Sequence, residues 1–97
     1  MIDAIIDTGF AGWVTLPPAI VAALGLPWRS KILGVLADGS ESRLDVYDGI
    51  VVWDRRARHI PVYGADAHPL VGMALLRGYE LKMQVRSRGK VTIKRLP

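Results

Sequence analysis

The segment Ala4-Ile5-Ile6-Asp7-Thr8-Gly9-Phe10-Ala11-Gly12 carries the most information about this chain. An ionisable carboxylate, that of Asp7, directly follows an apolar run typical of a strand and precedes a turn. A carboxylate in such a place is costly unless hydrogen bonds or a second titrating group accommodate it. Thr8 supplies a hydroxyl, and Gly9 lets the backbone turn tightly and direct N–H groups at the carboxylate. Taken alone, Asp-Thr-Gly is also an ordinary strand-ending turn, so its meaning depends on the rest of the chain.

The length and composition predict one small domain over residues 1–97. A chain of 97 residues can bury only a modest core, yet its hydrophobic fraction is 51%. This excess suggests that another subunit covers part of the apolar surface. No run approaches the roughly 20 apolar residues that span a bilayer, and the acidic N-terminus does not read as a secretory signal. The lack of cysteine excludes disulfides and thiolate metal sites and fits a cytoplasmic location.

The net charge of +4 is unevenly placed, because every charged residue after Glu80 is basic. A surface for nucleic acid or another acidic partner is one interpretation. The other is a hairpin with a solvated outer face, since Leu81 and Met83 alternate with Lys82 and Gln84. That period of two favours the hairpin, and we expect no nucleic-acid partner. Alternating basic residues would also discourage edge-to-edge aggregation.

The remaining pattern predicts a mainly β domain with two short helices, in a closed or folded-over sheet. Pro17-Pro18 opens a helix that runs to Leu24, because proline suits a first helical turn and Gly25 a position just past the end. The other expected elements are a buried strand at 2–6, a short strand at 13–15, strands at 31–37 and 42–53 around the turn Asp38-Gly39-Ser40, a polar turn at 54–58, a strand at 60–63, a helix at 73–77 ended by Gly78, and two final strands that meet at 87–89.

Four segments, in this order, resemble the retropepsin-like aspartic proteases, particularly the small single-domain bacterial type. They are Ile6-Asp7-Thr8-Gly9-Phe10-Ala11-Gly12, Leu16-Pro17-Pro18 through Pro27, Val35-Leu36-Ala37-Asp38-Gly39-Ser40, and Pro69-Leu70-Val71-Gly72-Met73-Ala74-Leu75-Leu76. The resemblance covers essentially the whole chain. It implies the closed acid-protease barrel of that family, with one lobe per chain.

The resemblance also implies an activity, aspartic endopeptidase, and a set of site residues. Asp7, Thr8 and Gly9 would form the catalytic loop, while Leu70, Val71 and Gly72 would pass behind the loop and support it. Substrate binding would fall to Phe10 and to the flap residues Ala37, Asp38 and Gly39. Because this chemistry needs two carboxylates and the chain has one Asp-Thr-Gly, the enzyme would be a homodimer acting on a polypeptide without a cofactor or metal.

One departure keeps a second interpretation open. Family members usually carry about one hairpin before the catalytic strand, whereas here the catalytic aspartate would already be residue 7. This favours, as the alternative, a non-catalytic protein-interaction module on the same fold.

Other candidates for chemistry are weaker. His59 and His68 lack metal-site spacing, and Ser40 has no nucleophile elbow around it. The run Arg55-Arg56-Ala57-Arg58 reads as a solvated turn, and the three tryptophans read as core or interface residues.

Overall fold

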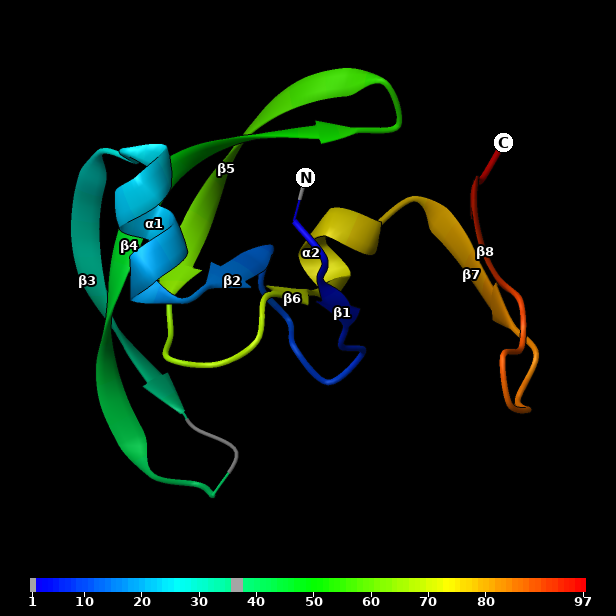
Figure 1. Ribbon diagram of the computed structural model, residues 1–97, viewed down its shortest axis with the longest axis horizontal. Coiled ribbons are helices and arrows are strands. Elements are labelled where there is room, and N and C mark those ends of the chain that lie inside the picture. Colours follow the sequence, from blue (N-terminus) through cyan, green and yellow to red (C-terminus); the bar gives the residue numbers. More distant parts are fainter. Residues whose placement is uncertain (1, 36–37) are drawn as a thin grey trace.

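The computed structural model describes residues 2–35 and 38–97 and shows a mainly β chain with two short helices, as predicted (Figure 1). The elements in chain order are β1 (Ile5–Ile6), β2 (Val14–Leu16), α1 (Pro18–Leu24), β3 (Trp28–Val35), β4 (Glu41–Trp53), β5 (Arg56–Gly64), β6 (Leu70–Val71), α2 (Met73–Leu76), β7 (Tyr79–Met83) and β8 (Val91–Arg95).

Six of the strands form one sheet in the order β1-β6-β2-β5-β4-β3. The strands β3, β4 and β5 form an antiparallel meander, with a register shift between Trp28 and Ser30 in the β3–β4 pairing. The short strand β6 inserts between β1 and β2, and it runs parallel to β1 and antiparallel to β2. The connection from β1 to β2 therefore passes around the end of β6, and this places the Asp7–Gly12 loop next to Gly72.

The helix α1 ends as the sequence predicts, whereas α2 ends at Leu76, one residue before the predicted end at Arg77. Pro17 occupies the N-cap position of α1, and the helix stops at Gly25, whose φ is 63° and whose N–H donates to the carbonyl of Ala22. A left-handed residue at this position is the usual helix terminator, and glycine adopts it without steric cost. After α2, Gly78 takes a φ of 89° and turns the chain away from the sheet.

The core lies where β2 and β5 meet one face of each helix. Val21 is the buried residue of α1, and Leu75 of α2 is fully enclosed, with 0% of its surface exposed. The buried cluster consists of Val14, Leu16, Val21, Ile60, Val62 and Leu75. Val46 and Leu76 are also buried, and these eight hydrophobic residues of the described chain are a small core, so much apolar surface stays outside it.

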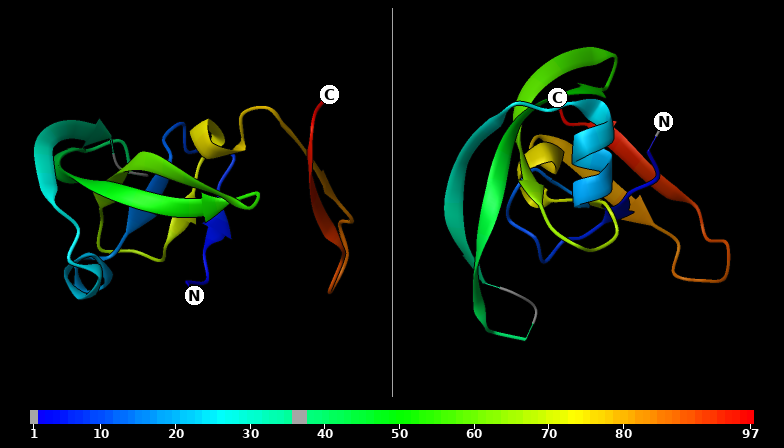
Figure 2. Two further views of the ribbon diagram at one scale, coloured as in Figure 1. Left: turned by 90° about the horizontal axis from the view of Figure 1, so that it is seen from above. Right: turned by 60° about the vertical axis from the view of Figure 1, so that its left-hand side comes forward.

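The last two strands form a separate two-stranded sheet, β7–β8, which we call the C-terminal arm (residues 79–95). The arm stands apart from the six-stranded sheet in Figure 1 and in the left view of Figure 2. The Cα radius of gyration is 14.1 Å, whereas a compact domain of this length would have about 12.5 Å. The projecting arm accounts for this extra extent.

The predicted alternation of the arm is confirmed. Leu81 lies opposite Ile93 and Met83 opposite Val91, while Lys82 lies opposite Thr92 in the intervening position. Successive residues of a strand point to opposite faces, so one face of the arm is apolar and the other is polar. The apolar face is nevertheless open to solvent, since 53% of Met83 and 54% of Val91 are exposed.

The described strands do not close into the expected barrel. The six-stranded sheet ends at β1 on one side and at β3 on the other, and the arm pairs only with itself. Closure would require the β1 edge to be joined to the β3 edge, and none of the described strands joins them.

Two local expectations were wrong. The predicted buried strand at 2–6 is limited to β1, and 53% of Ile5 is exposed because β1 lies at the sheet edge. The polar turn expected at 54–58 consists only of Asp54 and Arg55, which have φ values of 52° and 64°. Arg56 already belongs to β5, because the long β4–β5 ladder extends to the pair Trp53–Arg56.

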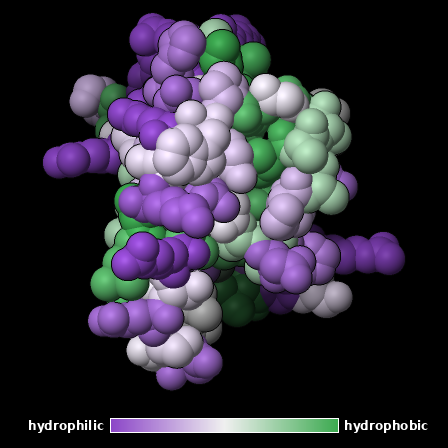
Figure 3. Space-filling model, turned by 90° about the vertical axis from the view of Figure 1, so that its left-hand side faces the viewer, coloured by the Kyte–Doolittle hydropathy of each residue, from purple (hydrophilic) through white to green (hydrophobic). Residues whose placement is uncertain are grey.

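The side of the molecule that carries β3 is largely hydrophilic, with small apolar patches between the polar side chains (Figure 3). Within residues 2–35 and 38–97, no helix is long and apolar enough to cross a membrane.

Candidate functional site

Asp7 lies directly after β1, where the sheet ends and the loop to β2 begins. The N–H of Asp7 donates to the carbonyl of Val71 at 2.9 Å, which anchors the residue to β6. Within the loop, the N–H of Gly9 donates to Oδ1 of Asp7 at 2.9 Å, and the N–H of Phe10 donates to the Asp7 carbonyl at 3.1 Å. The carboxylate is thus oriented by the loop that follows it, while Asp7 itself is only half-buried.

The segment from Leu70 to Gly72 lies against this loop. Leu70 pairs with Ile5 and Val71 with Ile6, so β6 runs directly beside the strand that leads to Asp7. A two-residue parallel pairing is too short to hold a loop alone, and the residues that follow supply further bonds.

Three successive backbone N–H groups at the start of α2 donate into the β1–β2 connection. The N–H of Gly72 bonds the carbonyl of Trp13 at 2.9 Å, that of Met73 bonds Phe10 at 2.8 Å, and that of Ala74 bonds Gly12 at 3.1 Å. The N-terminal amides of a helix have no partners inside the helix, and here loop carbonyls satisfy them. The β1–β2 connection is consequently held along its length.

Phe10 packs inside this arrangement. Its ring meets Tyr63 edge to face, with ring centroids 6.1 Å apart, and a Cβ added at Gly12 would lie 2.6 Å from the Phe10 ring. The half-buried ring therefore braces the loop against β5. Thr8, in contrast, lies at the exposed tip of the loop.

The β3–β4 turn contains Asp38 and Gly39, while Ala37 lies outside the described residues. Oδ1 of Asp38 accepts hydrogen bonds from the N–H of Ser40 at 2.8 Å and from its hydroxyl at 2.5 Å. The Ser40 hydroxyl is the main reason that the pKa of Asp38 lies below its ordinary value. Gly39 has a φ of 85°. The turn projects toward the same end of the molecule as the Asp7 loop (Figures 1 and 2).

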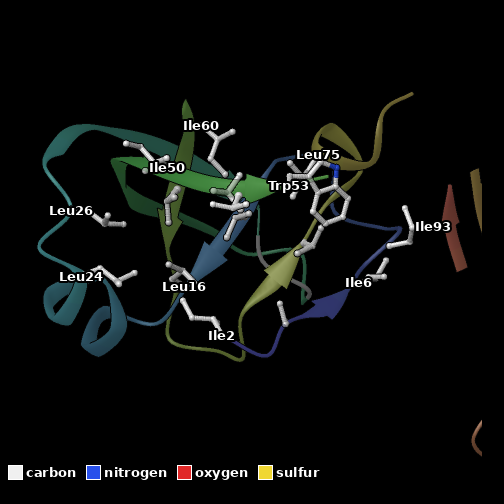
Figure 4. Close-up of a pocket in the computed structure, with 17 residues that line it drawn as sticks. Ile2, Ile6, Leu16, Leu24, Leu26, Ile50, Trp53, Ile60, Leu75 and Ile93 are labelled. Atoms are coloured by element: carbon white, nitrogen blue, oxygen red, sulfur yellow. The ribbon is translucent and has the colours of Figure 1, made fainter. Parts of the chain in front are cut away.

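An apolar groove opens beside the N-terminal segment and β1, and no sequence pattern predicted it (Figure 4). Its volume is about 420 Å³. Ile2 and Ile6 line one side, Ile50 and Trp53 come from β4, and Ile93 comes from the arm. Ile50 is 64% exposed although it faces other apolar side chains. The only advance signal was the high hydrophobic fraction of the chain.

A polar contact that the sequence also did not reveal joins the arm to the β4–β5 turn. Oδ2 of Asp54 accepts hydrogen bonds from the hydroxyl of Tyr79, at 2.9 Å, and from the guanidinium of Arg95. These two donors, the Tyr79 hydroxyl first, hold the pKa of the Asp54 carboxyl below its ordinary value.

His59 and His68 are exposed, as expected. Among the described residues, no group of three or more His, Cys, Asp and Glu side chains could hold a metal ion.

Comparison with known proteins found no matching family model, no matching curated protein and no matching solved structure.

Proposed function

We propose that this chain is one subunit of a homodimeric aspartic endopeptidase of the retropepsin type. The observation that carries the proposal is the insertion of β6 between β1 and β2, which holds the Asp-Thr-Gly loop from behind. An ordinary strand-ending turn needs no such support. A catalytic carboxylate does need it, because its position must be fixed to a fraction of an ångström.

The chemistry requires two such carboxylates around one water. One carboxylate takes a proton from the water as it attacks the peptide carbonyl, and the other donates a proton to the carbonyl oxygen. The chain contains a single Asp-Thr-Gly. A second Asp7 would therefore come from another copy, related by a two-fold axis through the two loops. Thr8, which is exposed at the loop tip, would hydrogen-bond across that axis.

Exposed apolar surface supports an assembly of copies. The apolar face of the arm and the apolar groove both lie open in the single chain. Contiguous apolar patches on a soluble protein usually mark a contact with another molecule. The closed barrel belongs to the same proposal: it would need the β1 edge to be joined to the β3 edge.

The substrate would lie extended between the Asp7 loops and the β3–β4 turns, bound largely through main-chain hydrogen bonds. Asp38 and Gly39 would contact it from the turn. Because Ser40 already donates two hydrogen bonds to Oδ1 of Asp38, we expect Asp38 to shape the turn. A change at Asp38 should therefore influence substrate affinity more than the chemical step. We also propose a cytoplasmic location, in line with the absence of cysteine.

Replacement of Asp7 by Asn tests the assignment. The Asn side-chain oxygen can still accept the Gly9 N–H, so the loop should keep its shape while general acid–base catalysis is lost. Cleavage of a quenched fluorescent peptide library should disappear in Asp7→Asn and persist in Asp3→Asn, which removes an exposed carboxylate close by in sequence. Undiminished cleavage by Asp7→Asn protein would exclude the protease assignment.

The open groove favours one second candidate, a non-catalytic interaction module that binds an extended apolar segment. The mass in solution distinguishes the two functions. A chain that stays monomeric at high concentration and cleaves no peptide would support the module.

A further inference from the structure

A second cavity lies between the C-terminal arm and the β4–β5 turn, away from the Asp7 loop. Its volume is about 420 Å³, and it is lined by Trp53, Arg56, Ala57, Arg58, Tyr79 and Arg95. We call it the arginine cleft. Three of its six lining residues are arginines, and two more are aromatic.

The strand geometry explains why the arginines converge. Arg56 and Arg58 are two residues apart on β5, so their side chains leave the same face of the strand. Arg95 reaches the cleft from β8 on the arm. The guanidinium of Arg58 lies over the ring of Trp13, 5.2 Å from its centroid, and this contact restrains its position.

Among the described residues, the only ion pair of the cleft joins Arg95 to Asp54. Asp54, at the adjoining turn, is the carboxylate bound to this group, and it already accepts from Tyr79 and Arg95. Three guanidinium groups and one carboxylate leave two positive charges in excess. Like charges held together repel one another, and an anion bound between them would relieve that repulsion.

We propose that the arginine cleft binds a phosphate-bearing anion. Guanidinium groups match phosphate oxygens in a two-pronged geometry, and the negative charge of a phosphate group would offset the excess positive charge. Trp53 and Tyr79 meet edge to face, with centroids 5.8 Å apart, and they form an aromatic wall beside the arginines. Such a wall suits the base of a nucleotide. Because the donors come from β5 and from β8, the bound anion would also tie the arm to the sheet.

Calorimetric titration with inorganic pyrophosphate, on the full chain at fixed ionic strength, tests the proposal. We expect saturable binding of one pyrophosphate per chain. Arg56→Gln and Arg58→Gln should each weaken it by about tenfold, because each removes a charge-assisted hydrogen-bonding group. The matched control is Lys94→Gln, which removes the same charge one residue from Arg95 but on the opposite face of β8. Its affinity should stay within about twofold of wild type.

Two results would overturn the proposal. One is the absence of saturable pyrophosphate binding. The other is a loss of affinity in Lys94→Gln as large as in the arginine variants, which would mean diffuse attraction to a basic arm. Circular dichroism of each variant checks folding. If Arg58→Gln fails to fold, Arg58→Lys replaces it in the test. This variant keeps the charge but loses the two-pronged geometry, so it should also bind pyrophosphate more weakly than wild type. Titration with ADP distinguishes a nucleotide from an inorganic polyphosphate as the natural ligand. Tighter binding of ADP supports a nucleotide stacked on the aromatic wall, and equal affinity supports an inorganic polyphosphate.

Discussion

Gly72 approaches Gly12 so closely that a Cβ built on Gly72 would lie 2.2 Å from the Gly12 carbonyl oxygen. The same Cβ would lie 2.8 Å from the carbonyl oxygen of Phe10. The φ of Gly72 is −102°, an angle open to any residue. Glycine is therefore required here for space and not for backbone conformation. The relationship joins the start of α2 to the loop that carries Asp7.

Substitution of Gly72 by Ala should consequently destabilise the chain by about 1–3 kcal/mol or more, the usual cost of overpacking. The clashing atoms belong to the backbone, which cannot move aside as a flexible side chain could. Gly39→Ala is the matched control, because a Cβ there meets nothing within 4 Å and only the φ of 85° opposes it. Urea unfolding followed by circular dichroism measures both. If Gly72→Ala were as stable as wild type, the close approach would be incorrect.

Association of the chain should strengthen as the pH falls, if two Asp7 carboxylates meet across a two-fold axis. Two adjacent carboxylates favour a shared proton, so the dimer would bind more protons than two separate monomers. Acidification then favours the species that binds more protons, until both carboxylates are protonated. In Asp7→Asn this dependence should largely vanish, and the dimer should tighten near neutral pH. Sedimentation equilibrium across a pH series measures it, and identical profiles for the two proteins would show that the Asp7 side chains do not face each other.

Acid should also release the arm from the β4–β5 turn. The Tyr79 hydroxyl, and next the Arg95 guanidinium, lower the pKa of Asp54 from its ordinary value of 3.8. Because the pKa of Asp54 is lower in the folded chain than in the unfolded chain, its bonds to Tyr79 and Arg95 stabilise the fold fully above pH 3.8. This stabilisation is lost as the pH falls below 3.8 and through the pKa of the folded chain. Emission from Trp53, which contacts Tyr79, should report the change in a variant with Trp13 and Trp28 replaced by Phe. In the same background, Asp54→Asn should show no such transition.

The polar face of the arm should bind nucleic acid weakly and without sequence preference. Its lysines alternate with apolar residues and point away from them, as expected for a solvated β face. Non-specific phosphate binding falls steeply with salt, so any complex with duplex DNA should dissociate as salt rises to the physiological range. A band-shift series at increasing salt tests this. A complex that persists at physiological salt and prefers one sequence would contradict the expectation.

Several elements could be predicted from the sequence because local chemistry specifies them. Pro17-Pro18 and Gly25 bound α1, Gly39 takes the left-handed conformation that its turn requires, and alternation sets the two faces of the arm. The regular strands β3, β4 and β5 were also located, although their ends differ. In each case, residues within a few positions of one another contain the necessary information.

The very short strands were harder to place, because two residues show no periodicity. Nothing local distinguishes β1 as an exposed edge from the buried strand that its isoleucines suggested. The start of β5 at Arg56 is likewise fixed by pairing with Trp53 across the hairpin and not by the polarity of the arginine run.

The sequence by itself determined the turn at Asp7-Thr8-Gly9, the ends of α1 and the alternation of the arm, since neighbouring residues set these features. Only the tertiary structure decided that β6 lies between β1 and β2, that the described strands leave the sheet open, and that three arginines share one cleft. These features depend on contacts between residues far apart in the chain, such as Asp7 with Val71 and Asp54 with Arg95. Such long-range contacts form through packing and hydrogen bonding in the folded chain, so they cannot be predicted from neighbouring residues in the sequence.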